Sequence, residues 1–124
     1  MGTNFYVKLE RKDGTVNTVH IGKRSCGWKF LFKDNPDYYK PTRRDINRFL
    51  VLNKDNFYDE YGQLQDPGEF WRDTVDKFNA GFDYLSYLNY RKNSGELVLE
   101  WEWNRARTTE FYSDGLRFTS SDFA

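Results

Sequence analysis

The stretch that decides the fold lies at the start of the chain, where residues 3–10 read Thr3-Asn4-Phe5-Tyr6-Val7-Lys8-Leu9-Glu10. Apolar side chains alternate with polar ones here, which is typical of a strand with one buried side. Asp13-Gly14 predicts a hairpin turn, because this pair tolerates positive φ. Residues 16–21 return as a second strand, a loop covers residues 22–27, and residues 28–32 predict a third strand. The chain therefore begins as an antiparallel meander.

Two helices are expected in the middle of the chain. Thr42 and Asp45 resemble a capping box, with Asp in place of the usual Glu, and predict a helix that ends near residue 52. Asp66 can cap a second helix, and Pro67 suits its first position. Gly81 is a natural stop for that helix. Residues 82–92 fit a helix slightly better than a strand.

The last third of the chain is predicted to return to strands. In residues 96–103, Leu97, Leu99, Trp101 and Trp103 would share one strand face, and Glu96, Glu100 and Glu102 the other. Residues 108–112 and 116–119 predict a final hairpin. Strands followed by helices and then strands indicate the α+β class. We expect a single domain over residues 1–124, with an antiparallel sheet of meander and C-terminal strands packed on two or three helices.

Composition excludes several classes of protein. The chain has 124 residues, which fits one domain, and aromatic residues make up 19% of it, which excludes wholesale disorder. No apolar run approaches the roughly 20 residues needed to span a bilayer, so no membrane partner is expected. Its one cysteine cannot form an internal disulfide, which predicts a reducing, cytoplasmic location.

Charge is divided unevenly along a chain whose formal net charge is zero. Residues 1–54 hold 12 Lys and Arg against 5 Asp and Glu, a net of +7, and the rest holds 7 against 14, a net of −7. Two interpretations stay open. The two parts attract each other across the fold, or the first part forms a basic surface for phosphates or an acidic partner.

The densest polar cluster lies in residues 20–28, and its candidate binding residues are His20, Gly22, Lys23, Arg24, Ser25, Gly27 and Trp28. The glycines would let backbone approach a ligand, the cations would hold a phosphate, and the indole would stack on a base. The spacing is not that of a P-loop. The alternative is an ordinary strand-connecting loop over a buried Trp28.

A second mixture of aromatic and basic residues comprises Tyr38, Tyr39, Arg43 and Arg44. Such interleaving serves single-stranded nucleic acids, and Tyr and Arg are also favoured in protein interfaces. These four residues are therefore added to the predicted partner-binding set.

Evidence for catalysis is thin. Cys26 and His20 form a conceivable nucleophile pair, for which the alternative is a small buried thiol and a hydrogen-bonded imidazole. We interpret Glu100 and Glu102 as members of an ion-paired surface, with Arg105, Arg107 and Arg117 as available partners, and not as paired acid and base. His20 and Cys26 are too few for a zinc site. No catalytic residue, metal or cofactor is therefore predicted.

Several motifs together resemble those of small, largely uncharacterised bacteriophage and prophage proteins: Met1-Gly2-Thr3-Asn4-Phe5-Tyr6, the His20-Ile21-Gly22-Lys23 run with Ser25, Gly27, Trp28 and Phe30, Asp59-Glu60-Tyr61-Gly62 before Phe70-Trp71, and Asp114-Gly115-Leu116-Arg117-Phe118 with Asp122-Phe123. Relatives of this kind often carry a cysteine-bearing, zinc-ribbon-like insert between the first two motifs. Residues 9–16 stand there in this chain and contain no cysteine, which removes the expectation of zinc.

The resemblance implies a phage-type accessory protein that acts by binding in the host cytoplasm. Its partner would be a host protein, such as a defence component, that the binding inhibits. The alternative is a module that binds nucleotide or nucleic-acid phosphates through residues 20–28. A third hypothesis is a small enzyme that uses Cys26 and His20. The sequence leaves the oligomeric state open.

Overall fold

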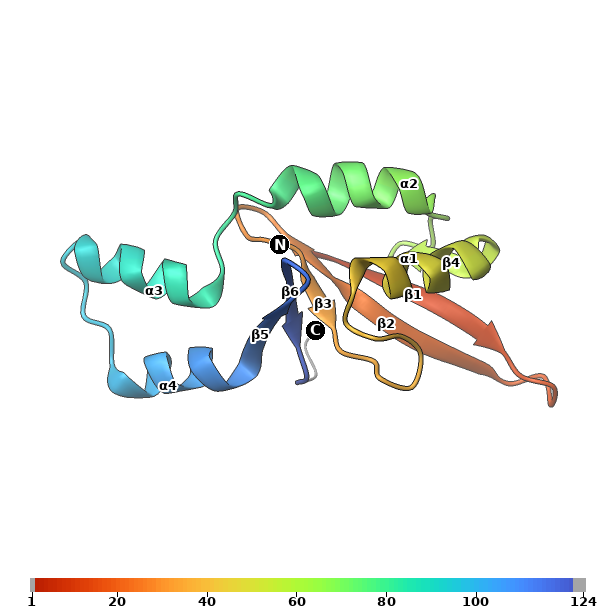
Figure 1. The fold of residues 1–124 in the computed structure, drawn as a ribbon, viewed down its shortest axis with the longest axis horizontal. Helices are drawn as coiled ribbons and strands as arrows, with labels where there is room; N and C mark the ends of the chain where they lie inside the picture. The colour runs from red at the N-terminus through yellow and green to blue at the C-terminus, as the bar shows by residue number, and fades with distance from the viewer. Residues whose placement is uncertain (1, 122–124) are drawn as a thin grey trace.

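The structure is a computed structural model that describes residues 2–121 of the chain; Met1 and the Asp122-Phe123 pair lie outside the described residues. It has the expected α+β fold, built on a six-stranded sheet of order β4-β1-β2-β3-β6-β5 (Figure 1). The strands are β1 (Gly2–Glu10), β2 (Val16–Ser25), β3 (Leu31–Lys33), β4 (Phe57–Asp59), β5 (Glu110–Ser113) and β6 (Leu116–Thr119). Neighbouring strands pair antiparallel, except that β3 and β6 are parallel.

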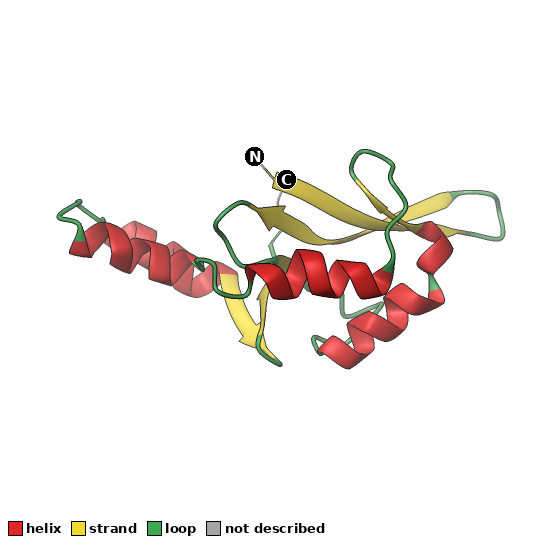
Figure 2. Cartoon of the chain, turned by 90° about the horizontal axis from the view of Figure 1, so that it is seen from above, coloured by secondary structure: helices red, strands yellow, loops and turns green. Residues whose placement is uncertain are grey.

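The helices form two groups. They are α1 (Arg43–Leu52), α2 (Pro67–Glu69), α3 (Tyr84–Asn93) and α4 (Glu100–Thr109), with a short 3₁₀ turn at Lys54–Asn56. The helix that begins as α2 continues as a π-helical segment (Phe70–Val75) and a 3₁₀ turn (Asp76–Phe78). This helix and α1 lie against one face of the sheet, whereas α3 and α4 extend beyond the sheet (Figure 2). Within residues 2–121, no helix is long and apolar enough to cross a bilayer.

Both predicted helix starts are confirmed. Thr42 caps α1 by accepting from the Asp45 N–H, and Asp66 caps α2 by accepting from the Glu69 N–H, with Pro67 at the first helical position. Each cap satisfies a backbone donor that the helix itself leaves unpaired.

An aromatic core fills the space between the sheet and its helices. Phe5 and Val7 of β1 are 3% and 0% exposed, so the predicted alternation is confirmed. Phe70, from the π-helical segment, lies 5.1 to 5.3 Å from the rings of Phe5, Phe30 and Phe57, at steep interplanar angles. Edge-to-face pairs of this kind contribute about 0.5–1.5 kcal/mol each beyond the area that they bury.

Strand β2 is longer than predicted. A bulge beside Phe5 lets it continue to Ser25, so residues 22–25 lie in a strand and not in a loop. Gly22 is needed there because a Cβ would lie 2.4 Å from the Leu31 carbonyl oxygen. The third strand is correspondingly late, at Leu31–Lys33 in place of residues 28–32.

The strand predicted for residues 96–103 is wrong: residues 96–99 have no regular secondary structure, and the rest form the first part of α4. Glu102 decides the outcome, because its carboxylate accepts from the Leu99 N–H at 3.0 Å and from Arg91 Nη1 at 2.7 Å. The first contact caps α4 and the second joins it to α3. Residues 82–92, which fitted a helix slightly better than a strand, are also mainly helical, because α3 begins at Tyr84.

The C-terminal hairpin is confirmed, except that its first strand begins at Glu110, because Thr108 and Thr109 belong to α4. Its turn uses positive φ at Asp114 and Gly115, and it joins β5 to β6. Strand β6 pairs on its other side with β3, in parallel, and all four of its residues are buried. The last strand of the chain is therefore an interior strand of the sheet.

Candidate protein-binding surface

Residues 82–109, here called the arm, form an antiparallel pair of helices that extends from one end of the molecule (Figure 1). Only Leu88 and Ala106 of the arm are buried, at 0% and 2% exposure. Two helices alone cannot cover their own apolar surface, because stable architectures bury it between packed layers. The arm lacks such a covering layer within the described chain.

Large apolar side chains remain exposed along the arm. Leu97 is 77% exposed, Trp101 58% and Tyr90 57%, and Leu85 and Leu99 follow at 39% and 45%. Apolar and polar residues alternate around α3, so this helix has no separate apolar face. Exposed apolar side chains grouped as they are on the arm are typical of interaction surfaces.

A groove of about 570 Å³ lies between the two helices of the arm. Leu85, Val98 and Trp103 supply its apolar lining, and the polar lining is Asn89, Lys92, Glu100 and Arg107. This volume is within the roughly 300–1,000 Å³ common for ligand pockets. The groove is large enough to receive apolar side chains from another molecule.

Charges on the arm fall into a paired and an unpaired set. Arg91 bridges Glu96 at 3.0 Å and Glu102 at 2.7 Å. The hydrogen bond from the Leu99 N–H lowers the pKa of Glu102 below its ordinary value, and the hydrogen bond from Arg91 lowers it further. Within residues 2–121, no ion pair engages the three charged residues of the groove, which are Lys92, Glu100 and Arg107. The groove therefore presents one net positive charge.

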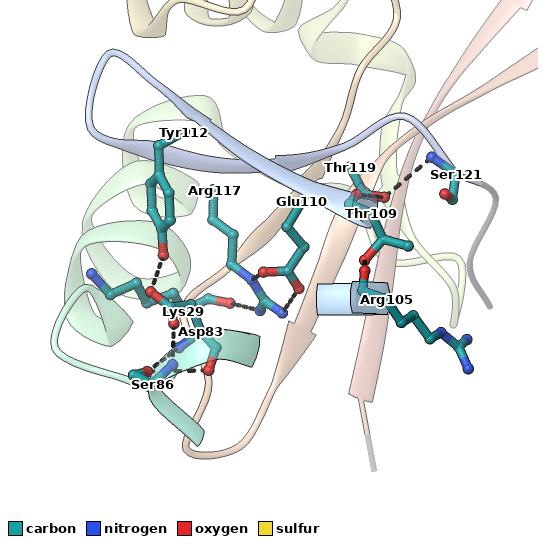
Figure 3. Close-up of polar contacts among 10 residues, drawn as sticks. All are labelled: Lys29, Asp83, Ser86, Arg105, Thr109, Glu110, Tyr112, Arg117, Thr119 and Ser121. Atoms are coloured by element: carbon teal, nitrogen blue, oxygen red, sulfur yellow. Dashed lines mark hydrogen bonds and ion pairs between the residues drawn. The ribbon is translucent and has the colours of Figure 1, made fainter. Parts of the chain in front are cut away.

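A polar network joins the arm to the sheet (Figure 3). Arg117 of β6 is 6% exposed and pairs with Glu110, with its Nε 3.0 Å from the carboxylate, and it also donates to the Lys29 carbonyl oxygen at 2.9 Å. The Tyr112 hydroxyl donates to Asp83 at 2.6 Å. Because Glu110 directly follows α4 and Asp83 directly precedes α3, these contacts hold both ends of the arm.

Asp83 also caps α3. Its carboxylate accepts from the Ser86 N–H at 2.7 Å, and the Ser86 hydroxyl accepts from the Asp83 N–H at 3.0 Å. Desolvation opposes ionisation of Asp83, but its hydrogen bonds with Tyr112 and Ser86 outweigh this effect and lower the pKa of the carboxyl. Burial and the same contact with Asp83 raise the pKa of Tyr112.

Trp28 belongs to this junction and not to an open loop. Its ring lies 5.1 Å from Tyr87 and 6.3 Å from Phe82, and the Arg117 guanidinium lies 5.4 Å from it. Backbone hydrogen bonds join Phe82 to Gly27 and Lys29 on either side of the tryptophan. The indole therefore packs between the arm and the sheet.

The structure divides the remaining residues of the predicted cluster. His20, Lys23 and Ser25 lie on the face of the sheet opposite the helices, because they share it with the register partners Tyr6, Asn4 and Gly2. Arg24 follows Lys23 in the strand and lies on the helix side, where its guanidinium is 5.9 Å from the Phe78 ring. The two predicted cations therefore serve different faces.

The second predicted group is also divided. Tyr39 is buried and donates to the Lys33 carbonyl oxygen, and burial raises its pKa. Arg43 makes a bidentate pair with Asp76 at 2.7 Å and lies over Trp71. Tyr38 and Arg44 are exposed. The first two residues have structural roles, and the last two remain available to a partner.

The candidate catalytic pair is not assembled. His20 lies in β2, with its Nε2 2.9 Å from Asn4 Oδ1, whereas Cys26 is exposed beyond the end of the strand. Five strand residues of about 3.3 Å each place His20 and Ser25 roughly 16 Å apart. Within residues 2–121, no group of three or more His, Cys, Asp and Glu is placed to hold a metal ion.

The exposed residues of the arm were missed as binding residues because Leu97, Leu99 and Trp101 fitted a strand face that would be buried. The ambiguity of residues 82–92 was the available signal, since tyrosines and leucines on every side of a helix leave it without a clear polar face. Comparison of the chain with protein-family models, curated proteins and solved structures finds no match.

Proposed function

We propose that this protein acts by binding another protein, and that the arm makes the contact. The observation that carries the proposal is a helical hairpin with most of its large apolar side chains exposed and only two residues buried. Aromatic and aliphatic anchors of this kind dominate the energetics of protein interfaces.

The groove indicates the chemistry of the partner. Leu85, Val98 and Trp103 would receive an apolar side chain, and Lys92 and Arg107 outnumber Glu100 among the charged residues. The fitting partner is a protein segment with an apolar anchor flanked by carboxylates, since opposite charges steer association and set register.

The resemblance to phage proteins supplies the biological setting of this proposal. The partner is then a protein of the bacterial host, such as a defence component. The arm inhibits this partner by covering the surface that the partner needs for its own activity. Contacts of Trp28 and Arg117 hold the arm on the sheet. This attachment supports such a blocking role, because an arm that is already held in place loses less conformational freedom when it binds.

The test compares capture from host lysate by the wild-type protein, by Trp101→Asp on the arm and by Leu52→Asp on α1. Leu52 is 77% exposed and lies outside the arm, so it is a matched control. We expect one protein to be retained by the wild type and the control and lost by the arm variant. Identical proteins in all three samples would overturn the proposal.

A second measurement distinguishes a partner from a second copy of this chain. Light scattering at increasing concentration should give the same monomeric mass for the wild type and for Trp101→Asp. A wild-type dimer that Trp101→Asp dissociates would show that the arm binds another copy, and the proposal of a host partner would then be wrong.

A further inference from the structure

The face of the sheet opposite the helices carries a row of rings. Tyr6 of β1 is the register partner of His20 in β2 and of Tyr58 in β4, so the three side chains cross adjacent strands on one face. The Tyr6 and His20 rings are stacked, with centroids 4.9 Å apart and 25° between their planes. All three residues are partly exposed. We call this the ring row.

A hollow of about 330 Å³ lies beside the ring row. It is lined by Tyr6, Lys8, Thr18, Asp59, Glu60 and Gly62. Its volume is at the small end of the range for ligand pockets, roughly 300–1,000 Å³. Planar rings beside a small hollow that contains charged side chains are typical of sites that hold a flat, hydrogen-bonding ligand.

Three kinds of ligand-binding group lie in order along β1. Asn4, Tyr6 and Lys8 share one face, and alternate residues of a strand lie about 6.6 Å apart. Glu60 adjoins the Asn4 end, since its Oε1 accepts from the Asn4 N–H at 2.8 Å. An acceptor, an aromatic ring and a cation therefore follow one another over roughly 13 Å.

The carboxylates of Asp59 and Glu60 differ in which of their oxygens already accept hydrogen bonds. Asp59 Oδ1 already accepts from the N–H groups of Tyr61 and Gln63, which holds the turn. Within residues 2–121, no hydrogen bond reaches Glu60 Oε2. Burial and the Glu60 carboxylate together raise the pKa of Tyr6, in keeping with a carboxylate close to that ring.

From this order we propose that the ring row binds a nucleotide whose base carries an exocyclic amino group, such as adenine or cytosine. The base stacks on Tyr6, its amino group donates to Glu60 Oε2, and Lys8 attracts the phosphate. The face is separate from the arm, so this binding does not depend on the proposed protein partner. A free nucleotide and a nucleotide within a single strand offer the same chemistry.

The first experiment tests the base preference. Titration calorimetry with ATP and with UTP should show at least tenfold tighter binding of ATP, since uracil has no amino group for Glu60. Glu60→Gln should bring the two affinities together. The amide oxygen of Gln can still accept from the Asn4 N–H, but an NH2 group then stands in place of Oε2 and cannot accept from the amino group of the base. Equal binding of ATP and UTP by the wild type, or no binding of either ATP or labelled (dA)10, overturns the proposal.

The second experiment tests stacking. Tyr6→Ala should weaken binding of the preferred probe about tenfold, whereas Tyr6→Phe should keep it, because the ring remains. Tyr61→Ala is the control, since Tyr61 is 72% exposed and does not line the hollow. Unchanged binding by a folded Tyr6→Ala variant contradicts the proposal.

The same titrations identify the source of the nucleotide. Tighter, salt-dependent binding of labelled (dA)10 than of ATP indicates a single strand, because neutralised phosphates release counterions. Equal affinity per site at constant salt indicates a free nucleotide.

Discussion

The body of the molecule and its arm are built from similar residues but hold them differently. Within residues 2–121, the fifteen buried residues of the hydrophobic core all come from the sheet, α1, the α2 helix and the segments between them, and none comes from the arm. Helices α3 and α4 of the arm carry five tyrosine and tryptophan rings, none of which belongs to this core, and Trp101 and Tyr90 are more than half exposed. The core of the body is therefore closed by the body's own elements, whereas large apolar side chains of the arm stay exposed.

The largest effect on stability is expected in the body. Phe70→Ala removes a ring that contacts Phe5, Phe30 and Phe57, and should lower the free energy of unfolding by about 3–5 kcal/mol. Urea denaturation followed by circular dichroism measures the change. A loss below about 1 kcal/mol would contradict the view that this ring is central to the body.

A somewhat smaller effect is expected where the body meets the arm. Arg117→Met leaves the Glu110 carboxylate, which is also largely buried, without its partner and should cost about 3 kcal/mol. The double variant Arg117→Met with Glu110→Met should recover most of that loss in the same denaturation experiment. If the double variant is less stable than the single one, the charges themselves are not the source of the effect.

Acid should weaken the arm through Asp83. The hydrogen bonds of Asp83 lower its pKa in the folded protein below the usual value of about 3.9, so they stabilise α3 above that pH. This contribution is lost as pH falls through the lowered pKa. Faster amide exchange in α3 than in β1 at such pH is the expected result.

Asp83→Asn is the matched control for the acid response, because Asn also caps helices but does not titrate in this range. The variant should show a smaller acid-induced increase of exchange in α3, because only Glu102, whose pKa is also lowered, still responds to acid in the arm. An acid response in Asp83→Asn as large as that of the wild type would assign the effect to another group.

The smallest effect on stability should come from the tip of the arm. Trp101→Ser should change the free energy of unfolding by less than about 0.5 kcal/mol, since the side chain is already exposed. The same variant should lose the protein partner. A substantial loss of stability measured by urea denaturation would mean that the indole packs within the arm, and the contrast with the body would weaken.

Local patterns predicted the body well because each depends on neighbouring residues. Alternation in β1, the caps at Thr42 and Asp66 and the last hairpin are all local in this sense. The α4 segment failed for the opposite reason. Its strand-like alternation is genuine, but Glu102 finds Arg91 eleven residues earlier, and that contact favours a helix.

The candidate site was harder to predict because side-chain direction depends on the bulge beside Phe5 and on strand length. Once β2 continues through residues 22–25, Lys23 and Arg24 must lie on opposite faces, however close they are in sequence. Sequence analysis named His20 and Lys23 as candidate binding residues, and the structure places both on the face opposite the helices. It could not show that Tyr6 and Tyr58 lie beside His20, because those partners come from two other strands.

The parallel pairing of β3 with β6 also has a consequence for biosynthesis. Leu31 finds its neighbour Arg117 only after all the residues between them have been translated. Until then the edge of β3 offers unsatisfied peptide groups, and such edges invite pairing with other chains. A chain that ends before β6 would keep this edge of the sheet open, so loss of the few residues of β6 should be more harmful than their number suggests.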